Sequence, residues 1–339
     1  MERVSYSKIT TAEGDWVRKA ILSIVLAVSA VLSAQNAPVD IGVAVKTPFR
    51  FVAFGDTRFT NPQNTGASNA AVRQAMVKAI AGEHPAFISI GGDIVYNGYN
   101  ANDWKVYDEE TRLWKETGIP VYPALGNHDL HGDLRLALAN YFARFPDLQK
   151  SWYYSVHAGN SLMLVLDSSE DETSGAQGEW LKQKFDTLSP DVSFVFVVLH
   201  HPPYTNSSNR DVLRGGGHSA RAREKKLARW LEARQQHLHA TIMVFSGHVH
   251  NYERHEHGGI TYFVTGGGGA HPYHISRAAD DPLRGFDVNY HYLLVEVKKD
   301  TVKVTMKRLE FIGDHPKWTA PDSVTIQAQR PASASGVSE

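Results

Sequence analysis

Five β-rich runs of this chain end directly in a short polar motif, and this feature constrains the fold more than any other. The runs alternate with stretches of helical periodicity, which is typical of α/β architecture. In open α/β sheets, ligands bind outside the carboxyl ends of the strands. The pattern therefore predicts that five strands deliver polar side chains to one edge of a sheet. The runs are residues 50–54, 86–90, 119–124, 194–199 and 241–245, followed by Asp56, Asp93, Asn127, His200 and the pair His248 and His250.

These polar groups are of the kinds that hold metal ions. Carboxylate and amide oxygens suit hard ions, and imidazole suits zinc, iron and manganese. The chain has no cysteine, so a metal site must use histidine and oxygen ligands. Two neighbouring ions need a carboxylate between them to offset their repulsion, and Asp93 is central in the order of the motifs. Glycines beside the motifs let the backbone turn sharply and approach the ions closely.

Composition and charge set limits on partners. The chain has 339 residues, of which 42% are hydrophobic and 21% charged, so it can bury a sizeable core without disulfides. Its formal net charge is −1, and no clustered basic excess indicates a nucleic-acid-binding surface. The densest basic stretch, residues 221–226, also holds Glu224; we interpret it as a solvated helix face, with an anion site as the alternative. Nothing in the sequence indicates an oligomeric state.

The N-terminal segment indicates export. Arg18 and Lys19 precede an unbroken run of apolar or small residues from Ala20 to Ala34. The run is short for a bilayer span but suits the apolar core of a signal peptide. We therefore expect residues 1–34 to be a signal peptide and the mature protein to be secreted or periplasmic, with no stable membrane span. An uncleaved anchor and a buried helix are the alternatives.

The rest of the chain is expected to form one domain with a tail. No long linker and no internal repeat interrupts residues 38–312. The end of the chain is rich in Ser, Ala, Gln and Pro, so we expect residues 313–339 to be a loose tail.

The five motifs, in this order, resemble the calcineurin-like metallophosphoesterase superfamily. Each motif alone is weak evidence, but all five follow a β-rich run in the superfamily's order. The resemblance covers residues 49–307 and implies a four-layer α/β/β/α sandwich with a dinuclear metal site at the carboxyl ends of the strands. The motifs are Gly55-Asp56, Gly92-Asp93, Gly126-Asn127-His128, His200-His201-Pro202-Pro203 and Gly247-His248-Val249-His250.

Within this superfamily the chain resembles the purple acid phosphatase branch. Most relatives carry Asp-x-His in the first motif, whereas this chain has Asp56-Thr57-Arg58. The branch also lacks that histidine and uses a tyrosine three residues after the bridging aspartate, and Tyr96 stands at that position after Asp93. Arg58 departs from the branch, which usually has glycine there. The fourth motif is equally typical of other phosphoesterases.

The resemblance implies two metal ions that share Asp93. A phenolate from Tyr96 would make Fe(III) the natural first ion, with Zn, Mn or Fe(II) as the second. The alternative is that Tyr96 only packs beside the site. The implied first ligand set is Asp56, Asp93, Tyr96 and His250, and the implied second set is Asp93, Asn127, His200 and His248.

The activity implied is acid-phosphatase-like hydrolysis of phosphate esters, either monoesters or diesters. Two ions lower the pKa of a water molecule, so that hydroxide exists near neutral pH for an in-line displacement. His128 lies outside the ligand positions and is the candidate to donate a proton to the leaving alkoxide or to bind the phosphate. Asp129 is a candidate to orient His128, although aspartate is also common in such turns. A non-catalytic phosphate- or protein-binding scaffold is the alternative, but such scaffolds typically lose ligands.

Weaker signals concern binding of the phosphate. Arg58 can place its guanidinium on a phosphate oxygen, with a surface salt bridge as the alternative. His201 follows a ligand position and contacts either the substrate or a ligand. His218 ends a polar, glycine-rich loop over residues 204–218 and is either near the substrate or a mobile surface side chain. We interpret Gly266–Gly269 as a tight turn packed near the metal site rather than a phosphate cradle, because no Lys-Ser or Lys-Thr follows.

Overall fold

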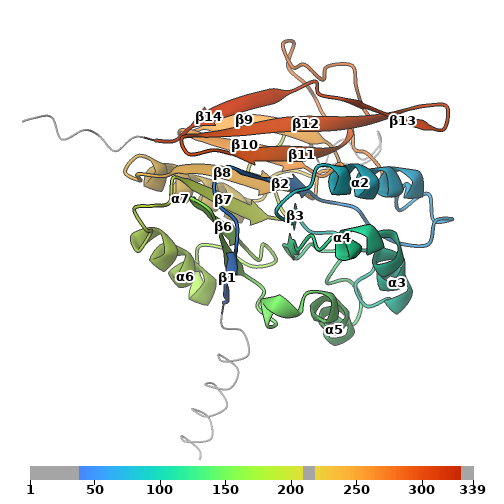
Figure 1. The fold of residues 1–339 in the computed structure, drawn as a ribbon, viewed down its shortest axis with the longest axis horizontal. Coiled ribbons are helices and arrows are strands. Elements are labelled where there is room, and N and C mark those ends of the chain that lie inside the picture. The colour runs from blue at the N-terminus through green and yellow to red at the C-terminus, as the bar shows by residue number, and fades with distance from the viewer. Residues whose placement is uncertain (1–37, 209–217, 330–339) are drawn as a thin grey trace, which may run out of the picture. The chain divides into compact units, whose positions relative to one another are not determined.

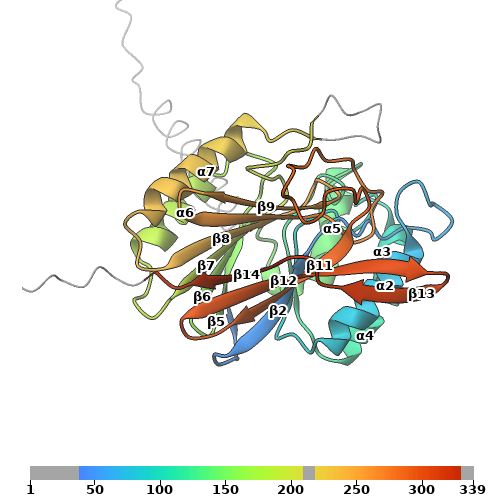
Figure 2. The same ribbon diagram turned by 90° about the horizontal axis from the view of Figure 1, so that it is seen from above.

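The computed structural model describes residues 38–208 and 218–329. From Val39 onward the described chain forms one compact unit, in which two β-sheets pack face to face and helices cover their outer sides (Figures 1 and 2). The predicted four-layer α/β/β/α sandwich is confirmed. The predicted signal peptide lies outside the described residues. No helix among the described residues is long and apolar enough to cross a membrane.

The first sheet has seven strands within the described residues, in the order β1-β5-β6-β7-β8-β10-β9. Its centre is parallel, because β6, β7, β8 and β10 run in the same direction. The strands β5 and β9 run against their neighbours β6 and β10. The strands are β1 (Asp40–Val43), β5 (Tyr154–Ala158), β6 (Ser161–Val165), β7 (Phe194–Leu199), β8 (Thr241–Ser246), β9 (Tyr252–His257) and β10 (Ile260–Thr265).

The second sheet has the order β13-β12-β11-β2-β3-β4, with β14 paired to β12. The strands β2, β3 and β4 are parallel, whereas β11, β12, β13 and β14 form antiparallel pairs. The parallel strands carry the first three polar motifs at their carboxyl ends. The strands are β2 (Phe49–Phe54), β3 (Ile88–Ile90), β4 (Val121–Pro123), β11 (Tyr290–Val297), β12 (Thr301–Ile312), β13 (His315–Thr319) and β14 (Ser323–Gln327).

Helices flank the two sheets on opposite sides (Figure 1). Three of them begin after an Asn or Asp whose side chain accepts a backbone N–H of the first turn, namely Asn69, Asn100 and Asp133. α2 packs beside α3, α4 and β11, and α7 packs on β8. The helices are α2 (Ala70–Gly82), α3 (Ala101–Glu110), α4 (Arg112–Glu116), α5 (Leu134–Arg144), α6 (Gly175–Asp186) and α7 (Ala222–Gln235), with a 3₁₀ turn η1 (Pro146–Leu148).

Strand β7 shows how one sheet serves two cores. Successive side chains of a strand point to opposite faces. Phe194 and Phe196 belong to the larger hydrophobic core, where the ring of Phe196 lies 5.0 Å from that of Phe51 on the other sheet. Val195 and Val197 belong to a second core with α6 and α7. Burial on both faces explains why the run is apolar throughout. The end of the apolar run therefore marks the end of the strand and the start of the polar motif.

The prediction of a loose tail from residue 313 onward is wrong for the part that the structure describes. Residues 315–319 and 323–327 form β13 and β14, and both pair with β12. The segment is rich in polar residues because these strands are largely exposed on one face. Val324 and Ile326 nevertheless alternate with exposed residues and pack against the larger core. Residues 330–339 lie outside the described residues.

A buried acid beneath α7 makes the stability of this layer depend on pH. The side chain of Glu172 is wholly buried next to Glu224, whose carboxylate is paired with Arg221 and Arg223. Burial, reinforced by the charge of Glu224, raises the pKa of Glu172 to about 8. The folded state therefore keeps a proton that the unfolded chain releases near the ordinary value of 4.5, so the free energy of unfolding falls as the pH rises between these two values.

Replacing Glu172 with glutamine should remove this part of the pH dependence. The neutral amide mimics the protonated acid, so variant and wild type should have similar Tm values near pH 5. The variant should melt a few degrees higher by about pH 8.5. Scanning calorimetry across this range tests the prediction, with the exposed neighbour Glu170→Gln as the control. A difference in Tm that stays constant with pH contradicts it.

Candidate metal centre

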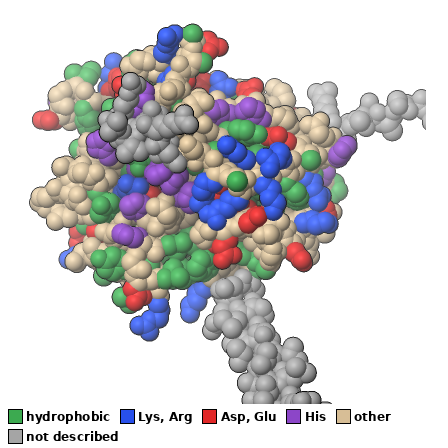
Figure 3. All heavy atoms as spheres, turned by 180° about the vertical axis from the view of Figure 1, so that it is seen from behind, with side chains coloured by type: hydrophobic (Ala, Val, Ile, Leu, Met, Phe, Trp, Pro, Cys, Tyr) green, Lys and Arg blue, Asp and Glu red, His purple; other side chains and the backbone are tan. Residues whose placement is uncertain are grey.

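The carboxyl ends of the parallel strands bring the five motifs to one place. The turns after β2, β3 and β4 on one sheet meet those after β7 and β8 on the other. Glycines permit this approach. A Cβ at Gly126 would lie 2.2 Å from the backbone nitrogen of Asp93, and one at Gly247 would lie 2.5 Å from Oδ2 of Asp56. On the face seen in Figure 3, histidine side chains gather next to a group of Lys and Arg side chains.

The backbone of these turns is strained. Asp56, Arg58, Asp93 and His248 all have positive φ, between 45° and 68°, which non-glycine residues rarely adopt. Hydrogen bonds hold this conformation: the N–H of Asp56 donates to the carbonyl of Gly92 at 3.0 Å, and that of Arg58 donates to the carbonyl of Asp93 at 3.0 Å. Such strain costs about 1–3 kcal/mol per residue and gathers at functional sites. The side chains of both aspartates are fully buried at these turns.

A first cluster consists of Asp56, Asp93 and His250, whose oxygen and nitrogen atoms lie within 4.8 Å of one another. Nε2 of His250 lies 3.5 Å from Oδ1 of Asp56, and both atoms are buried without a hydrogen-bond partner among the described residues. The other ring nitrogen of His250 lies 2.6 Å from the carbonyl of His271, which places the proton on Nδ1. When Asp56 is ionised, two buried acceptors face each other, and a cation between them satisfies both.

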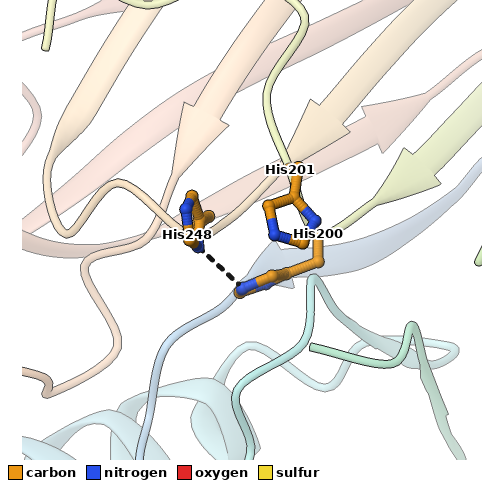
Figure 4. Close-up of side chains that lie close together, drawn as sticks. All are labelled: His200, His201 and His248. Carbon is orange, nitrogen blue, oxygen red and sulfur yellow. Dashed lines mark hydrogen bonds between the residues drawn. The ribbon is translucent and has the colours of Figure 1, made fainter. Parts of the chain in front are cut away.

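A second cluster surrounds Nε2 of His200. This atom lies 3.0 Å from Oδ1 of Asn127, 3.3 Å from Oδ1 of Asp93 and 3.1 Å from Nδ1 of His248 (Figure 4). Nδ1 of His200 lies 2.8 Å from the carbonyl of Gly91, so that nitrogen carries the proton and Nε2 offers a lone pair. The donor set suits a borderline metal ion, and Asp93 belongs to both clusters.

The two central carboxylates carry opposite pKa shifts. Burial raises the pKa of Asp56 to about 8, with the charge of Asp93 adding to the shift and His200 opposing it. Burial acts in the same direction on Asp93, but electrostatic interactions with His200 and Arg58 lower its pKa well below the usual range. Two carboxylates this close resist ionising together unless a cation lies between them. The electrostatics of the site therefore fit a metal ion at the first cluster.

His128 lies beside the clusters and is held by the backbone. Its N–H donates to Oδ1 of Asp93 at 2.9 Å, and its Nδ1 lies 2.6 Å from the carbonyl of Tyr96. Burial lowers the pKa of its imidazole. The suggestion that Asp129 orients His128 is wrong, because the Asp129 carboxylate accepts the backbone N–H groups of Ile94 and Gly126. Asp129 therefore ties two motif turns together, and the Tyr96 carbonyl orients the ring of His128.

The tyrosine predicted as a ligand is half-buried at the edge of the site. The ring of Tyr96 lies 5.4 Å from that of His128, with a tilt of 32° between the two planes. Its backbone N–H donates to the carbonyl of Phe59 at 3.1 Å. The structure thus places Tyr96 next to the third motif, and its role toward a metal ion stays a prediction.

Arg58 forms a buried ion pair, so the alternative of a surface salt bridge is wrong. Its Nη2 lies 3.1 Å from Oδ2 of Asp93, and only 12% of its side chain is exposed. Nε is 3.4 Å from the same oxygen. Asp93 thus presents Oδ1 to His200 and the His128 N–H, and Oδ2 to Arg58. A positive charge stands where most relatives carry the histidine of the first motif.

The other two predicted substrate-binding histidines both lie against His248. The ring of His218 is 4.2 Å from that of His248, so the structure brings His218 to the site. The ring of His201 is 4.3 Å from it, and its Nδ1 lies 2.8 Å from the hydroxyl of Ser168 (Figure 4). Burial lowers the pKa of His201, so its ring stays neutral. These contacts favour a role for His201 in supporting His248.

Sequence reasoning missed Tyr273 and His271, which form the wall behind the first cluster. The ring of Tyr273 stacks on His250 at 4.0 Å with 18° between the planes. His271 accepts the ring proton of His250 through its carbonyl. Both follow the Gly266–Gly269 turn in a segment without strand or helix, so no periodic pattern marks them.

The glycine run Gly266–Gly269 is a packed turn next to the site, as predicted. Two of its backbone N–H groups hold the turn in place: that of Gly266 donates to the carbonyl of Asn251, and that of Gly268 to the carbonyl of Gly55. A Cβ at Gly268 would lie 2.4 Å from the same Gly55 oxygen. The absence of a side chain therefore lets the turn pack under the first motif.

The chain belongs to the calcineurin-like phosphoesterase family, whose model matches residues 49–252. Among curated proteins, it is 27% identical over 180 residues to purple acid phosphatase 15 of Arabidopsis thaliana, which covers 48% of this chain and 32% of that protein. It is 26% identical over 144 residues to purple acid phosphatase 23 of the same plant, covering 40% and 29%. The chain thus spans about a third of the length of these relatives.

Solved structures share the fold. A purple acid phosphatase from yellow lupin seeds (Lupinus luteus) has a TM-score of 0.63 and 16% identity, over 83% of this chain and 54% of that one. A dimetal phosphatase from Danio rerio has a TM-score of 0.54 and 14% identity, over 83% and 99%. GAP50, the anchor in the inner membrane complex of Plasmodium, has a TM-score of 0.58 and 15% identity, over 85% and 91%. These structures show a shared fold, and membership of the calcineurin-like phosphoesterase family implies a dinuclear metal site.

Proposed function

We propose that this protein is a hydrolase of phosphate esters that works with two metal ions. The observation that carries the proposal is the place of Asp93 between two groups of side chains. It lies with Asp56 and His250, whose facing atoms are buried without a hydrogen-bond partner among the described residues, and its Oδ1 is 3.3 Å from Nε2 of His200. Family membership supports phosphoester hydrolysis as the reaction. The plant relatives are far longer than this chain, so their activity is assigned to it only as a proposal.

In this proposal the chain holds the ions with seven side chains. The ions, when bound, supply Lewis acidity: they lower the pKa of water and offset charge on the phosphoryl oxygens. The Gly91 and His271 carbonyls keep His200 and His250 in the tautomer that a metal needs. The proposed set is Asp56, Asp93, Tyr96 and His250 for the first ion and Asp93, Asn127, His200 and His248 for the second.

His128 is the proposed proton donor. Its Nδ1 is committed to the Tyr96 carbonyl, so Nε2 is the ring atom left for the substrate. In the doubly protonated form of the imidazole, Nε2 carries a proton that it can give to the leaving oxygen or share in a hydrogen bond with a phosphoryl oxygen. Arg58 and His218 are proposed to contact the phosphoryl group, whereas His201 is proposed to act through His248.

Hydrolysis of chromogenic esters tests the proposal. Purified protein is stripped of metal, reloaded with Fe, Zn or Mn, and assayed with an aryl phosphate monoester and the matching diester. Turnover that appears only in metal-loaded samples supports the proposal. Folded protein that binds metal and turns over neither ester would favour the alternative of a binding scaffold.

Tyr96 decides the identity of the proposed first ion. If its phenolate binds Fe(III), the iron-loaded protein should be coloured by charge transfer from phenolate to iron. Tyr96→Phe should then lose this visible absorption and bind iron less tightly, because a hard anionic donor is missing. Visible spectra and elemental analysis of both proteins measure the effect. A colourless iron-loaded wild type with no loss of iron in the variant contradicts this assignment.

We propose that the protein is exported and is secreted or periplasmic. This location rests on the apolar run from Ala20 to Ala34 behind Arg18 and Lys19. Expression of the full chain, followed by cell fractionation and N-terminal sequencing, should find a shortened protein outside the cytoplasm. Full-length protein in the cytoplasm contradicts this location.

A further inference from the structure

Glu253, the second residue of β9, is a buried carboxylate that holds the segment after the fourth motif. Only 3% of Glu253 is exposed. Its Oε1 accepts the hydroxyl of Thr205 at 2.5 Å, and its Oε2 accepts the backbone N–H of Asn206 at 2.7 Å. Nε2 of His255 lies 3.1 Å from the same Oε2. A buried carboxylate is costly unless polar partners surround it, and these donors supply them. The acid therefore fixes residues 205 and 206 to β9.

A continuous path of hydrogen bonds leads from Glu253 to His218. The hydroxyl of Thr205, which donates to the carboxylate, also accepts the backbone N–H of Ser207 at 3.0 Å. The hydroxyl of Ser207 in turn accepts the backbone N–H of His218 at 3.1 Å. Ser207 is itself buried, so water does not readily replace it in this bond. The backbone at His218 is therefore tied to the segment that Glu253 anchors.

The ring of His218 reaches the candidate metal centre from this backbone position. It lies 4.2 Å from the ring of His248, and its Nε2 lies 3.5 Å from the hydroxyl of Tyr273. His218 belongs to no strand or helix, so its place depends on contacts of this kind. An imidazole here can donate a hydrogen bond to an oxygen of an anion at the clusters. A displacement of about 1 Å is enough to lose much of such a contact.

We propose that Glu253 is a positioning residue that holds His218 at the metal centre, where His218 binds an oxygen of a phosphoryl group. The inference rests on the proposed function for the identity of the ligand. Glu253 acts through the hydroxyls of Thr205 and Ser207, and it touches neither the substrate nor a metal ion. Its loss should therefore change phosphate affinity and KM, and leave the binding of metal ions unchanged.

One variant removes the negative charge of Glu253. Glu253→Gln keeps the size of the side chain, but its NH2 group cannot accept the hydrogen bonds that a second carboxylate oxygen accepts. Glu256→Gln is the matched control, because Glu256 lies on the same strand with an exposed side chain that pairs with Arg254.

A second pair of variants breaks the path without changing any charge. Thr205→Val has nearly the same shape but lacks the hydroxyl that joins Glu253 to Ser207. Thr205→Ser keeps a hydroxyl and should restore the path. Thr187→Val is the matched control, because the Thr187 hydroxyl is exposed and bonds the carbonyl of Gln183 at the end of α6.

Position and binding are measured separately. NMR spectra of the histidine side chains in metal-free protein report the surroundings of the His218 ring, whose signals are assigned by their absence in His218→Ala. Calorimetry with inorganic phosphate on metal-loaded protein reports binding and needs no turnover. Elemental analysis gives the bound metal, and steady-state kinetics with an aryl monoester give kcat and KM separately.

The expected result is a loss that depends on His218. His218→Ala should weaken phosphate binding about tenfold, the size of one hydrogen bond to a charged group. Glu253→Gln and Thr205→Val should each shift the His218 signals, and should weaken phosphate binding and raise KM by roughly threefold to tenfold. Bound metal and kcat should change by less than about twofold, and Thr205→Ser and both controls should match the wild type. Either substitution should add less than about twofold to the loss in His218→Ala, because both act on one contact.

Three results would overturn the inference. Unchanged His218 signals in both Glu253→Gln and Thr205→Val would show that the path does not position the ring. Unchanged phosphate affinity in His218→Ala, in a protein that hydrolyses the monoester, would remove the contact and leave the proposed function intact. Losses that add fully to that of His218→Ala would show that Glu253 acts by another route. The expected pattern in a protein that hydrolyses no ester would sustain the inference and contradict the proposed function.

Discussion

Asp93→Asn should abolish hydrolysis of phosphate esters, with kcat lowered by at least about a thousandfold. Asp93 is the group shared by both clusters: its Oδ1 faces His200, and its Oδ2 pairs with Arg58. A neutral amide removes the negative charge that two ions would share. It also leaves the guanidinium of Arg58 buried without its counter-charge, which is strongly unfavourable. Bound metal should fall together with the rate, as measured by elemental analysis and chromogenic assays on the same samples.

A buried carboxylate elsewhere provides the control. Asp322 is also buried and pairs with Arg254, but it lies beside β14 rather than in the site. Asp322→Asn should lower the melting temperature and leave bound metal and kcat close to the wild type. Full turnover with two bound ions in folded Asp93→Asn would remove the basis for Asp93 as the bridging group.

Removing the imidazole of His128 should lower kcat by about a hundredfold to ten-thousandfold while bound metal stays unchanged. The ring lies outside both clusters and is fixed by the Tyr96 carbonyl, so its loss should not open the metal centre. The loss should be larger for an alkyl phosphate than for a nitrophenyl phosphate, because an alkoxide needs a proton more than a nitrophenolate does. Steady-state kinetics of His128→Ala with both substrates measure this difference.

The neighbouring His131 serves as the control for His128. Its ring is 6.1 Å from that of His128 and bonds Asn97 at the exposed side of the same turn. His131→Ala should retain most of the wild-type kcat. If His128→Ala loses metal as well as activity, the residue supports the metal centre, and the assignment as proton donor is contradicted.

The central strands are predictable from the sequence, whereas the edges of the sheets are not. β7 and β8 are buried on both faces, so their apolar runs mark the strands and the positions of the polar motifs. β1, β9 and β13 lie at sheet edges and carry charged or polar residues, so periodicity does not reveal them. This is also why the end of the chain resembles a tail.

Some residues of the site are likewise predictable from the sequence, and others are not. The side chains that follow central strands, such as Asp56 and His200, are placed by local sequence and strand direction alone. Contacts between segments without regular structure depend on the tertiary fold, and the sequence carries no signal for them. The stack of Tyr273 on His250 and the three backbone N–H groups that the Asp129 carboxylate accepts are of this kind. The position of Arg58 cannot be predicted from the sequence, because an arginine can form either a surface salt bridge or the buried ion pair that it forms with Asp93 in the structure.

The most direct test of a dinuclear metal centre around Asp93 is a titration of metal-free protein with Zn or Mn, in which bound metal and monoester turnover are measured on the same samples. We expect two tightly bound ions per chain and turnover that rises with occupancy, while Asp93→Asn loses both. Folded wild-type protein whose turnover is independent of metal, or that binds no ion at the clusters around Asp93, would contradict this expectation.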